Sequence, residues 1–235
     1  MGLCSRRPTR VPLLTKRHRQ LRLQWAQERR DWTMDEWKKI AWSDESLFLI
    51  HHVDGRVRVH RLPGERLLPS CTECHTQASG GGIMLWGTFS WLAPTSIVVV
   101  EQTMKAANYL NIIVDELHPY MAFVFPAGNG IFHQDNAPCH KARIVLEWLE
   151  EHTYEFHLMS WPPNLPDLNS MEHIWDVMER QLRAQTPPCP NISTLRDRCL
   201  DIWYNLFPVM YQKFVASMPR QVAAVLKAKG VSTRY

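Results

Sequence analysis

The order of two hydrophobic periodicities along the chain restricts its fold more than any other feature. From Ile40 to Ile50 successive side chains alternate between two faces with a period of two, which predicts a β-strand. Residues 56–62, 83–91 and 96–101 continue this pattern, and Asp54-Gly55 is typical of a tight hairpin turn. The core of the chain therefore begins with strands that pair in antiparallel hairpins.

Helical periodicity then takes over and alternates with short strands. Residues 103–124 carry apolar side chains at three- and four-residue steps, which predicts a long helix that bends near Pro119. Early strands followed by alternating helices and strands predict an α/β (α+β) fold, a mixed sheet with helices on its faces. The later elements that we expect are a strand over 130–135, a helix over 141–152, a strand over 154–161, a proline-rich loop over 162–167, a helix over 169–185 and two or three helices from residue 193 onward.

Positive charge is concentrated at the front of the chain. Residues 1–30 contain nine Lys or Arg and a single acid, Glu28, whereas the whole chain has a net charge of only +4. Basic groups that neutralise phosphates release counterions, so this segment predicts a polyanionic partner. The alternative is a solvated basic helix. The residues that we expect to contact phosphates are Arg6, Arg7, Arg10, Lys16, Arg17, Arg19 and Arg22.

This basic segment predicts a division of the chain into an arm and a body. A helix over 15–32 with Thr15 as its cap, followed by a capping box from Thr33 to Glu36, forms the expected basic arm over 1–36. The remaining residues, 37–235, form the expected body. With 45% hydrophobic residues the chain is able to bury a sizeable core.

The cysteines and one uncharged segment indicate the cellular environment in which the chain is expected to fold. Six cysteines at irregular spacing, without a secretory signal, favour reduced thiols inside the cell. Cys71-Thr-Glu-Cys74-His75 resembles half of a zinc site, but no second pair stands at suitable spacing, so structural zinc is the less favoured interpretation. Residues 77–100 lack charge, yet glycines and Pro94 interrupt them, which favours core strands over a membrane segment.

Three carboxylates stand where expected elements begin or end: Asp44, Asp135 and Glu172. Meeting at one sheet edge, they would hold divalent cations, since Mg²⁺ prefers oxygen ligands and two such ions clamp both oxygens of a phosphoryl displacement. Each also has a simpler interpretation: Glu172 as the capping-box partner of Asn169, Asp135 as a turn former, and Asp44 as an edge-strand residue. The neighbouring Glu45 leaves open which carboxylate points inward.

The motifs around these acids are more specific than their spacing, and together they resemble the catalytic domain of mariner-superfamily cut-and-paste transposases, particularly the Tc branch. The resemblance covers essentially the whole chain. The motifs, in chain order, are Trp42-Ser-Asp-Glu-Ser46, Gly80-Gly-Gly-Ile-Met-Leu-Trp-Gly87, His133-Gln-Asp-Asn-Ala-Pro-Cys-His140 and Trp161-Pro-Pro-Asn-Leu-Pro-Asp-Leu-Asn-Ser-Met-Glu-His-Ile-Trp175.

The resemblance implies a ribonuclease-H-like mixed five-stranded sheet with additional C-terminal helices. It implies that Asp44, Asp135 and Glu172 are a DDE triad that binds two Mg²⁺ or Mn²⁺ ions. Metal-activated water would cut DNA beside the terminal repeats of a transposable element, and the freed 3′-hydroxyl would attack target DNA at a TA dinucleotide. A homodimer assembled on DNA, in the nucleus, is the expected form.

The chain departs from the family pattern in three places. Ser170 replaces a proline that would preset the first helical turn, and the interval from Asp135 to Glu172 is slightly longer than usual. Family members also carry paired helix-turn-helix domains that this chain is expected to lack, so sequence-specific end binding should be absent or weak. These departures keep two alternatives open: a non-catalytic, co-opted DNA-binding remnant and another ribonuclease-H-like nuclease.

Residues beside the triad have two possible roles. His133 and His140 flank Asp135 and either contact metal-bound water or DNA, or serve packing and hydrogen bonding. Asn136 and Asn169 are expected to orient the acids. The tryptophans expected in the core rather than in base stacking are Trp42, Trp86, Trp148, Trp161 and Trp175.

Overall fold

A five-stranded mixed sheet forms the centre of the computed structural model, which describes residues 4–6, 14–50, 59–61, 81–100, 103–163 and 165–233. The strand order is β5-β4-β2-β6-β7; β4 is antiparallel to β2 and β5, whereas β6 and β7 run parallel to β2. The strands are β2 (Ile40–Leu49), β4 (Gly82–Phe89), β5 (Val98–Val100), β6 (Gly130–His133) and β7 (Phe156–Leu158).

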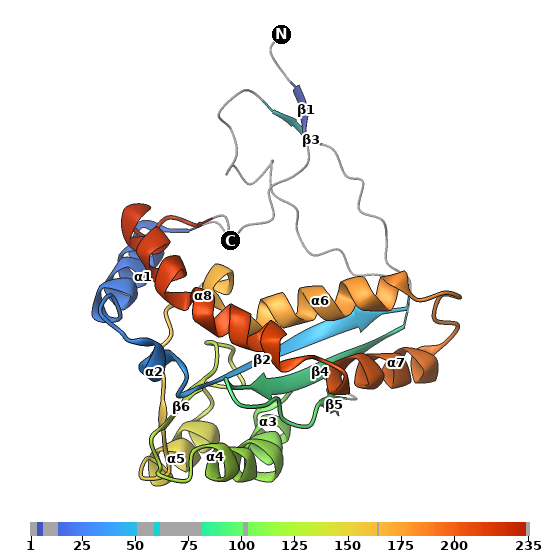
Figure 1. Cartoon of the computed structure of the whole chain (residues 1–235), viewed down its shortest axis with the longest axis horizontal. Helices are drawn as coiled ribbons and strands as arrows, with labels where there is room; N and C mark the ends of the chain where they lie inside the picture. Colours follow the sequence, from blue (N-terminus) through green and yellow to red (C-terminus); the bar gives the residue numbers. More distant parts are fainter. Residues whose placement is uncertain are drawn as a thin grey trace.

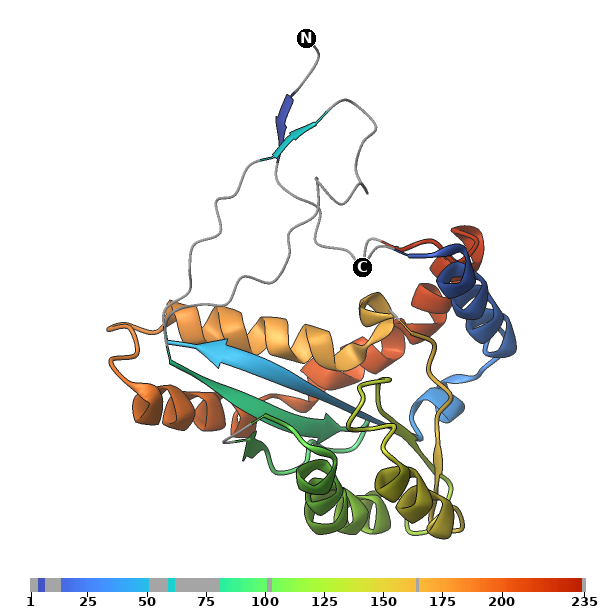
Figure 2. The same ribbon diagram turned by 180° about the vertical axis from the view of Figure 1, so that it is seen from behind.

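Helices cover both faces of this sheet (Figures 1 and 2). One face packs against α3, α4 and α5, and the other against α6, α7, α8 and the front helices α1 and α2. Their bounds are α1 (Lys16–Glu28), α2 (Met34–Trp37), α3 (Ala106–Ile112), α4 (His118–Val124), α5 (Arg143–Glu151), α6 (Ser170–Ala184), α7 (Ile192–Tyr204) and α8 (Pro208–Lys227).

The sheet separates two hydrophobic cores. Trp42 and Trp175 belong to the core on the α6 face, while Trp86 belongs to the core under α3 and α4. Trp161 is also buried, so four of the five predicted core tryptophans are confirmed. Trp148 is only partly buried, because α5 lies at the periphery and its indole stacks on a histidine ring.

The front helix belongs to the body of the molecule. Trp25 and Ala26 of α1 are buried in the same core as Trp175, and α1 packs against α8. Thr15 caps α1 through its hydroxyl, and the predicted capping box of Thr33 and Glu36 is present at α2. The predicted division after residue 36 therefore separates residues that share one core.

Two predicted elements differ in the structure. The segment expected to return from β2 as a hairpin contributes β3 (Val59–Arg61), which pairs instead with β1 (Cys4–Arg6); Asp54-Gly55 lies outside the described residues. The long helix over 103–124 changes its winding between α3 and α4, where a π-helical turn, η2 (Ile113–Leu117), intervenes. The change precedes Pro119, which lies in the first turn of α4.

The described cysteines Cys139, Cys189 and Cys199 have free thiols. Cys71, Cys74 and His75, the half-site considered for zinc, lie outside the described residues. Among the helices in the described ranges, none combines the length and the apolar character needed to cross a membrane.

Candidate active site

Strand pairing brings the first two carboxylates together. Trp42 of β2 is in register with His133 of the parallel strand β6. Asp44 and Asp135 each follow two residues after these paired positions. Since β2 and β6 are hydrogen-bonded neighbours, both acids emerge at the same end of β6. β6 ends at His133, two residues earlier than predicted, so Asp135 lies in the turn that follows the strand.

Asp44 lies under the helix that carries the third acid. Its Oδ2 accepts a hydrogen bond from the indole Nε1–H of Trp175, one turn beyond Glu172 on α6, at 3.2 Å. The pKa of Asp44 is raised well above its ordinary value, first by burial and then by the negative charges of Glu172, Glu45 and Asp135. Burial and these three charges therefore oppose ionisation of Asp44.

Glu172 owes its position to the start of α6. Asn169 is the N-cap, and its side-chain oxygen accepts the Met171 N–H at 3.1 Å, so Asn169 orients the helix that carries the acid. Ser170, in the place of the family's proline, is fully buried, and its hydroxyl lies 3.6 Å from the sulfur of Met218. Glu172 is exposed in the first turn, where the helix dipole favours a negative charge.

Asp135 differs from Asp44 because a cation compensates it. Its Oδ1 accepts the Ala137 N–H at 2.8 Å and lies 2.7 Å from Nδ1 of His140. On the other side of the ring, Nε2 of His140 lies 3.1 Å from Oε1 of Glu45. Both contacts of Asp135 involve Oδ1, which leaves the lone pairs of Oδ2 for a metal ion.

The pKa values of Asp135 and His140 follow from those contacts. Burial lowers the pKa of His140, but hydrogen bonds and charge attraction from Asp135 and Glu45 outweigh burial and raise it to about 10. Burial raises the pKa of Asp135, but His140 and the Ala137 N–H outweigh it and lower the value. At neutral pH Asp135 is therefore a carboxylate and His140 an imidazolium.

His133 has a packing role. Its ring is fully buried, 4.2 Å from the Trp161 ring and 4.9 Å from the Trp42 ring between centroids. Burial lowers the pKa of His133 to about 3, so the ring is neutral. This matches the packing alternative considered from the sequence, whereas His140 directly contacts an acid of the triad.

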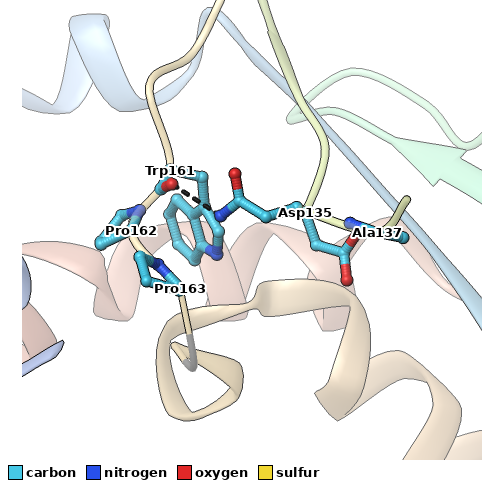
Figure 3. A pocket seen from close by; sticks show the side chains of 6 residues that line it. Asp135, Ala137, Trp161, Pro162 and Pro163 are labelled. Atoms are coloured by element: carbon cyan, nitrogen blue, oxygen red, sulfur yellow. Dashed lines mark hydrogen bonds between the residues drawn. The ribbon is translucent and has the colours of Figure 1, made fainter. Parts of the chain in front are cut away.

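A pocket of about 240 Å³ opens beside Asp135 (Figure 3). Asn136 donates from Nδ2 to the carbonyl oxygen of Trp161 at 2.8 Å, which ties the turn after β6 to the proline-rich loop. Asn136 thus holds the pocket wall rather than an acid. The lining residues are Asp135, Asn136, Ala137, Trp161, Pro162 and Pro163.

The expectation that Arg22 contacts phosphates is wrong, because its side chain is fully buried. Its guanidinium donates two hydrogen bonds to Asp167, at 2.6 and 2.7 Å, and a third to the carbonyl of Gly230 at 3.1 Å. Burial raises the pKa of Asp167, but Arg22 outweighs burial and lowers it. Arg22 therefore anchors the loop that leads into α6 and Glu172.

The other basic residues expected at the DNA divide into two groups. Lys16, Arg17 and Arg19 are exposed on α1. The structure describes only the backbone of Arg6, and Arg7 and Arg10 lie outside the described residues.

Sequence reasoning missed three supporting residues. Glu45 faces His140, and the ring of Tyr109 lies 4.0 Å from the His140 ring between centroids. The Tyr109 hydroxyl donates to Oε1 of Gln134 at 2.6 Å, next to Asp135 in the chain. The period of two in β2 places Glu45 and Asp44 on opposite faces, but it does not say which face holds the site, and it gives no signal for Tyr109 or Gln134.

The donor set fits a hard divalent cation. Asp44, Asp135 and Glu172 supply carboxylate oxygens, the ligands that Mg²⁺ and Mn²⁺ prefer. Their mutual repulsion, visible in the raised pKa of Asp44, is the electrostatic condition that a bound cation relieves. The three acids thus lie on β2, in the turn after β6 and in the first turn of α6, near enough for the charges of Asp135 and Glu172 to act on Asp44.

Comparisons with known proteins agree with this geometry. The family described as DDE superfamily endonuclease matches residues 39–196. The transposable element Tc1 transposase of Caenorhabditis elegans is 33% identical over 236 residues, which cover 100% of this chain and 84% of the relative. The Tcb1 transposase of Caenorhabditis briggsae is 33% identical over 235 residues, with the same coverage of both chains.

Solved structures confirm the predicted ribonuclease-H-like fold. The catalytic domain of Mos1 mariner transposase matches with a TM-score of 0.73 at 16% sequence identity, over 95% of this chain and 99% of that chain. A pre-cleavage Mos1 transpososome matches with a TM-score of 0.76 at 17% identity, over 100% of this chain and 69% of that chain.

Proposed function

Since this chain belongs to the DDE endonuclease superfamily, as a transposase catalytic domain of the Tc1/mariner type, we propose that Asp44, Asp135 and Glu172 are its catalytic triad. The observation that carries the proposal is their convergence. Strand β2, the turn after β6 and the first turn of α6 bring the three carboxylates near one another, and burial and neighbouring negative charges oppose ionisation of Asp44. We infer that the triad holds two divalent ions.

The reaction is metal-dependent cleavage and strand transfer of DNA. The Mos1 transposase catalytic domain has been solved with Mg and with Mn, and such ions, when bound, activate the attacking oxygen and stabilise the leaving one. Asp44 must lose its proton to act as a ligand. His140 keeps Asp135 anionic and fixes its Oδ1, so that Oδ2 is presented to the ion.

The substrate is DNA at the ends of a transposable element and at a TA target site. Related Mos1 structures are paired-end and strand-transfer complexes, which supports a DNA substrate and an assembly of two copies on DNA. The pocket beside Asp135 would receive the strand next to the scissile phosphate. Lys16, Arg17 and Arg19 on α1 would contact phosphates without reading bases. The nucleus is the compartment in which this substrate is present.

A strand-transfer assay tests the proposal. The chain is incubated with pre-cleaved transposon ends, a TA-containing target and Mn²⁺, alongside Asp135→Ala and the exposed-carboxylate control Asp115→Asn. We expect joined product with the parent and Asp115→Asn, and its loss with Asp135→Ala. Equal product with Asp135→Ala would overturn the role of this acid, and salt-dependent DNA binding without cleavage at any divalent ion would favour the non-catalytic alternative.

A further inference from the structure

A second group of metal-ligating side chains lies away from the triad. His118, His152 and Glu155 each offer one ligand atom, and these atoms all lie within 4.8 Å of one another. Glu155 precedes Phe156, which pairs with Gly130 at the start of β6, whereas Asp135 follows the end of β6. This histidine cluster therefore stands at the opposite end of the strands from the triad.

The rings are oriented by the indole and backbone of Trp148. The Nδ1–H of His152 donates to the carbonyl oxygen of Trp148 at 2.7 Å, so Nε2 is the ring nitrogen that can bind a metal ion. The His152 ring stacks on the Trp148 indole at 3.8 Å, and the His118 ring meets the same indole edge-on at 5.6 Å. A hydrogen bond from one ring nitrogen to a carbonyl is the arrangement that metal-binding histidines commonly show.

The surroundings favour a cation. His152 is the C-cap of α5, where the helix dipole places partial negative charge, and Glu150 and Glu151 end the same helix. Nε2 of His118 already contacts Oε2 of Glu155. The side chains of His118 and Glu155 are 34% and 27% exposed, so a metal ion and a water ligand have access from solvent.

The donor set indicates which metal would bind. Two imidazole nitrogens and one carboxylate oxygen suit zinc, whereas Mg²⁺ and Mn²⁺ prefer oxygen ligands throughout. Bond lengths of about 2.0–2.1 Å in a tetrahedron place ligand atoms roughly 3.4 Å apart, so small side-chain rotations would close the present spacing. Water would supply the fourth ligand.

We propose that His118, His152 and Glu155 form a zinc site, independent of the triad, that ties the start of α4 to the end of α5 and the entry of β7. Its role is to stabilise this end of the α3–α5 layer. Zinc bound only by the folded chain shifts the unfolding equilibrium by mass action.

Zinc titration of matched variants tests the site. The metal-free parent, His152→Ala, Glu155→Gln and the control His157→Ala, a nearby exposed histidine outside the cluster, are titrated by calorimetry and melted with and without zinc. The triad and all cysteines are identical in the four proteins, so differences between them report on the cluster. We expect the parent and His157→Ala to bind one more zinc ion than His152→Ala, with at least about tenfold weaker binding in Glu155→Gln.

The same melting curves separate a metal site from a simple ion pair. Zinc should raise the Tm of the parent and of His157→Ala, and this zinc-dependent rise should be smaller in His152→Ala. Equal zinc stoichiometry and equal zinc-dependent Tm shifts in the parent and His152→Ala would overturn the proposal. Failure of strand transfer would leave it unaffected, because neither readout involves DNA.

Discussion

The two helical layers support the same site by different physical means. On the α6 face, Asp44 contacts an indole N–H inside an aromatic core, and burial together with nearby carboxylates raises its pKa. On the α3–α5 face, Asp135 contacts His140, and the imidazolium lowers its pKa. Asp44 on β2 and Asp135 in the turn after β6 therefore have pKa values shifted in opposite directions.

This difference indicates at which of the two acids a bound metal ion adds the more favourable interaction. Asp135 already has a cationic partner, so a metal replaces part of an interaction that exists. Asp44 is buried and has three negative neighbours that oppose its ionisation, so a bound metal ion would relieve a repulsion that the apoprotein does not. We infer that relief of the repulsion at Asp44, on the aromatic α6 side, drives metal binding. The contact of Asp135 with His140, on the ionic α3–α5 side, fixes the geometry of the site.

Removing the charge on the aromatic side should have the largest effect. Asp44→Asn deletes a ligand from the metal site, and a metal contributes several kcal/mol to stabilisation of such a transition state. We expect strand transfer to fall by at least about a thousandfold in single-turnover assays. Asp197→Asn, an exposed carboxylate on α7, is the matched control. Activity within a few fold of the parent would contradict the role of Asp44.

Removing the cation on the ionic side should have an intermediate effect. His140→Ala leaves Asp135 without its partner, and loss of such a supporting contact typically costs about 10–100-fold in metal affinity or activity. Mn²⁺ affinity measured by calorimetry, together with the strand-transfer rate, checks this. An unchanged Mn²⁺ affinity together with an unchanged strand-transfer rate would contradict the supporting role of His140.

The pH dependence of stability in the same variant tests whether His140 is charged in the folded protein. The pKa of His140 is raised from 6.5 to about 10 in the folded state, so its stabilising contribution is complete below pH 6.5 and is lost as pH rises toward 10. The Tm difference between the parent and His140→Ala should therefore shrink across this interval. A constant difference from pH 6 to pH 10 would show that His140 is not charged.

Disturbing the aromatic packing should cost less. A Cβ at Gly87, which pairs with Asp44, would lie 2.8 Å from Cη2 of Trp203 and 3.3 Å from Cη2 of Trp175. We expect Gly87→Ala to lower stability by about 1–3 kcal/mol, measured by urea unfolding. Gly81→Ala is the control, because its Cβ meets the flexible end of Ile192. An unchanged midpoint in Gly87→Ala would argue against tight packing over Asp44.

The smallest expected effect has the opposite sign. Because the folded-state pKa of Asp44 is raised above 3.8, ionising it costs stability as pH rises from that value through the folded pKa. Asp44→Asn should therefore stabilise the metal-free chain at pH 7 and raise its Tm. Saturating Mn²⁺ should reverse the order of the two Tm values. A lower Tm of metal-free Asp44→Asn would contradict the repulsion.

The elements that carry the three acids were easier to predict from the sequence than the side chains that contact them. Asp44, Asp135 and Glu172 stand in motifs whose local signals, a period of two and an N-cap, also fix the elements that carry them. The direction of Glu45 was open because both faces of β2 are covered, so alternation cannot distinguish inside from outside. Only tertiary packing decides that point.

Arg22 shows a second limit of sequence reasoning. Within α1 it belongs to a run of basic residues that resembles a solvated or DNA-binding face. Its partners, Asp167 and the carbonyl of Gly230, lie 145 and 208 residues away in the chain. Local periodicity does not contain such contacts, and neither does it predict the π-helical turn at 113–117.

Anomalous diffraction from crystals of the chain soaked in Mn²⁺ tests most directly whether Asp44, held by Trp175, and Asp135, held by His140, bind the same metal site. The predicted result is Mn²⁺ density within about 2.2 Å of carboxylate oxygens of Asp44, Asp135 and Glu172, strongly reduced in Asp44→Asn. Absence of density between these acids at a Mn²⁺ concentration that supports strand transfer, or equal density in Asp44→Asn, would contradict it.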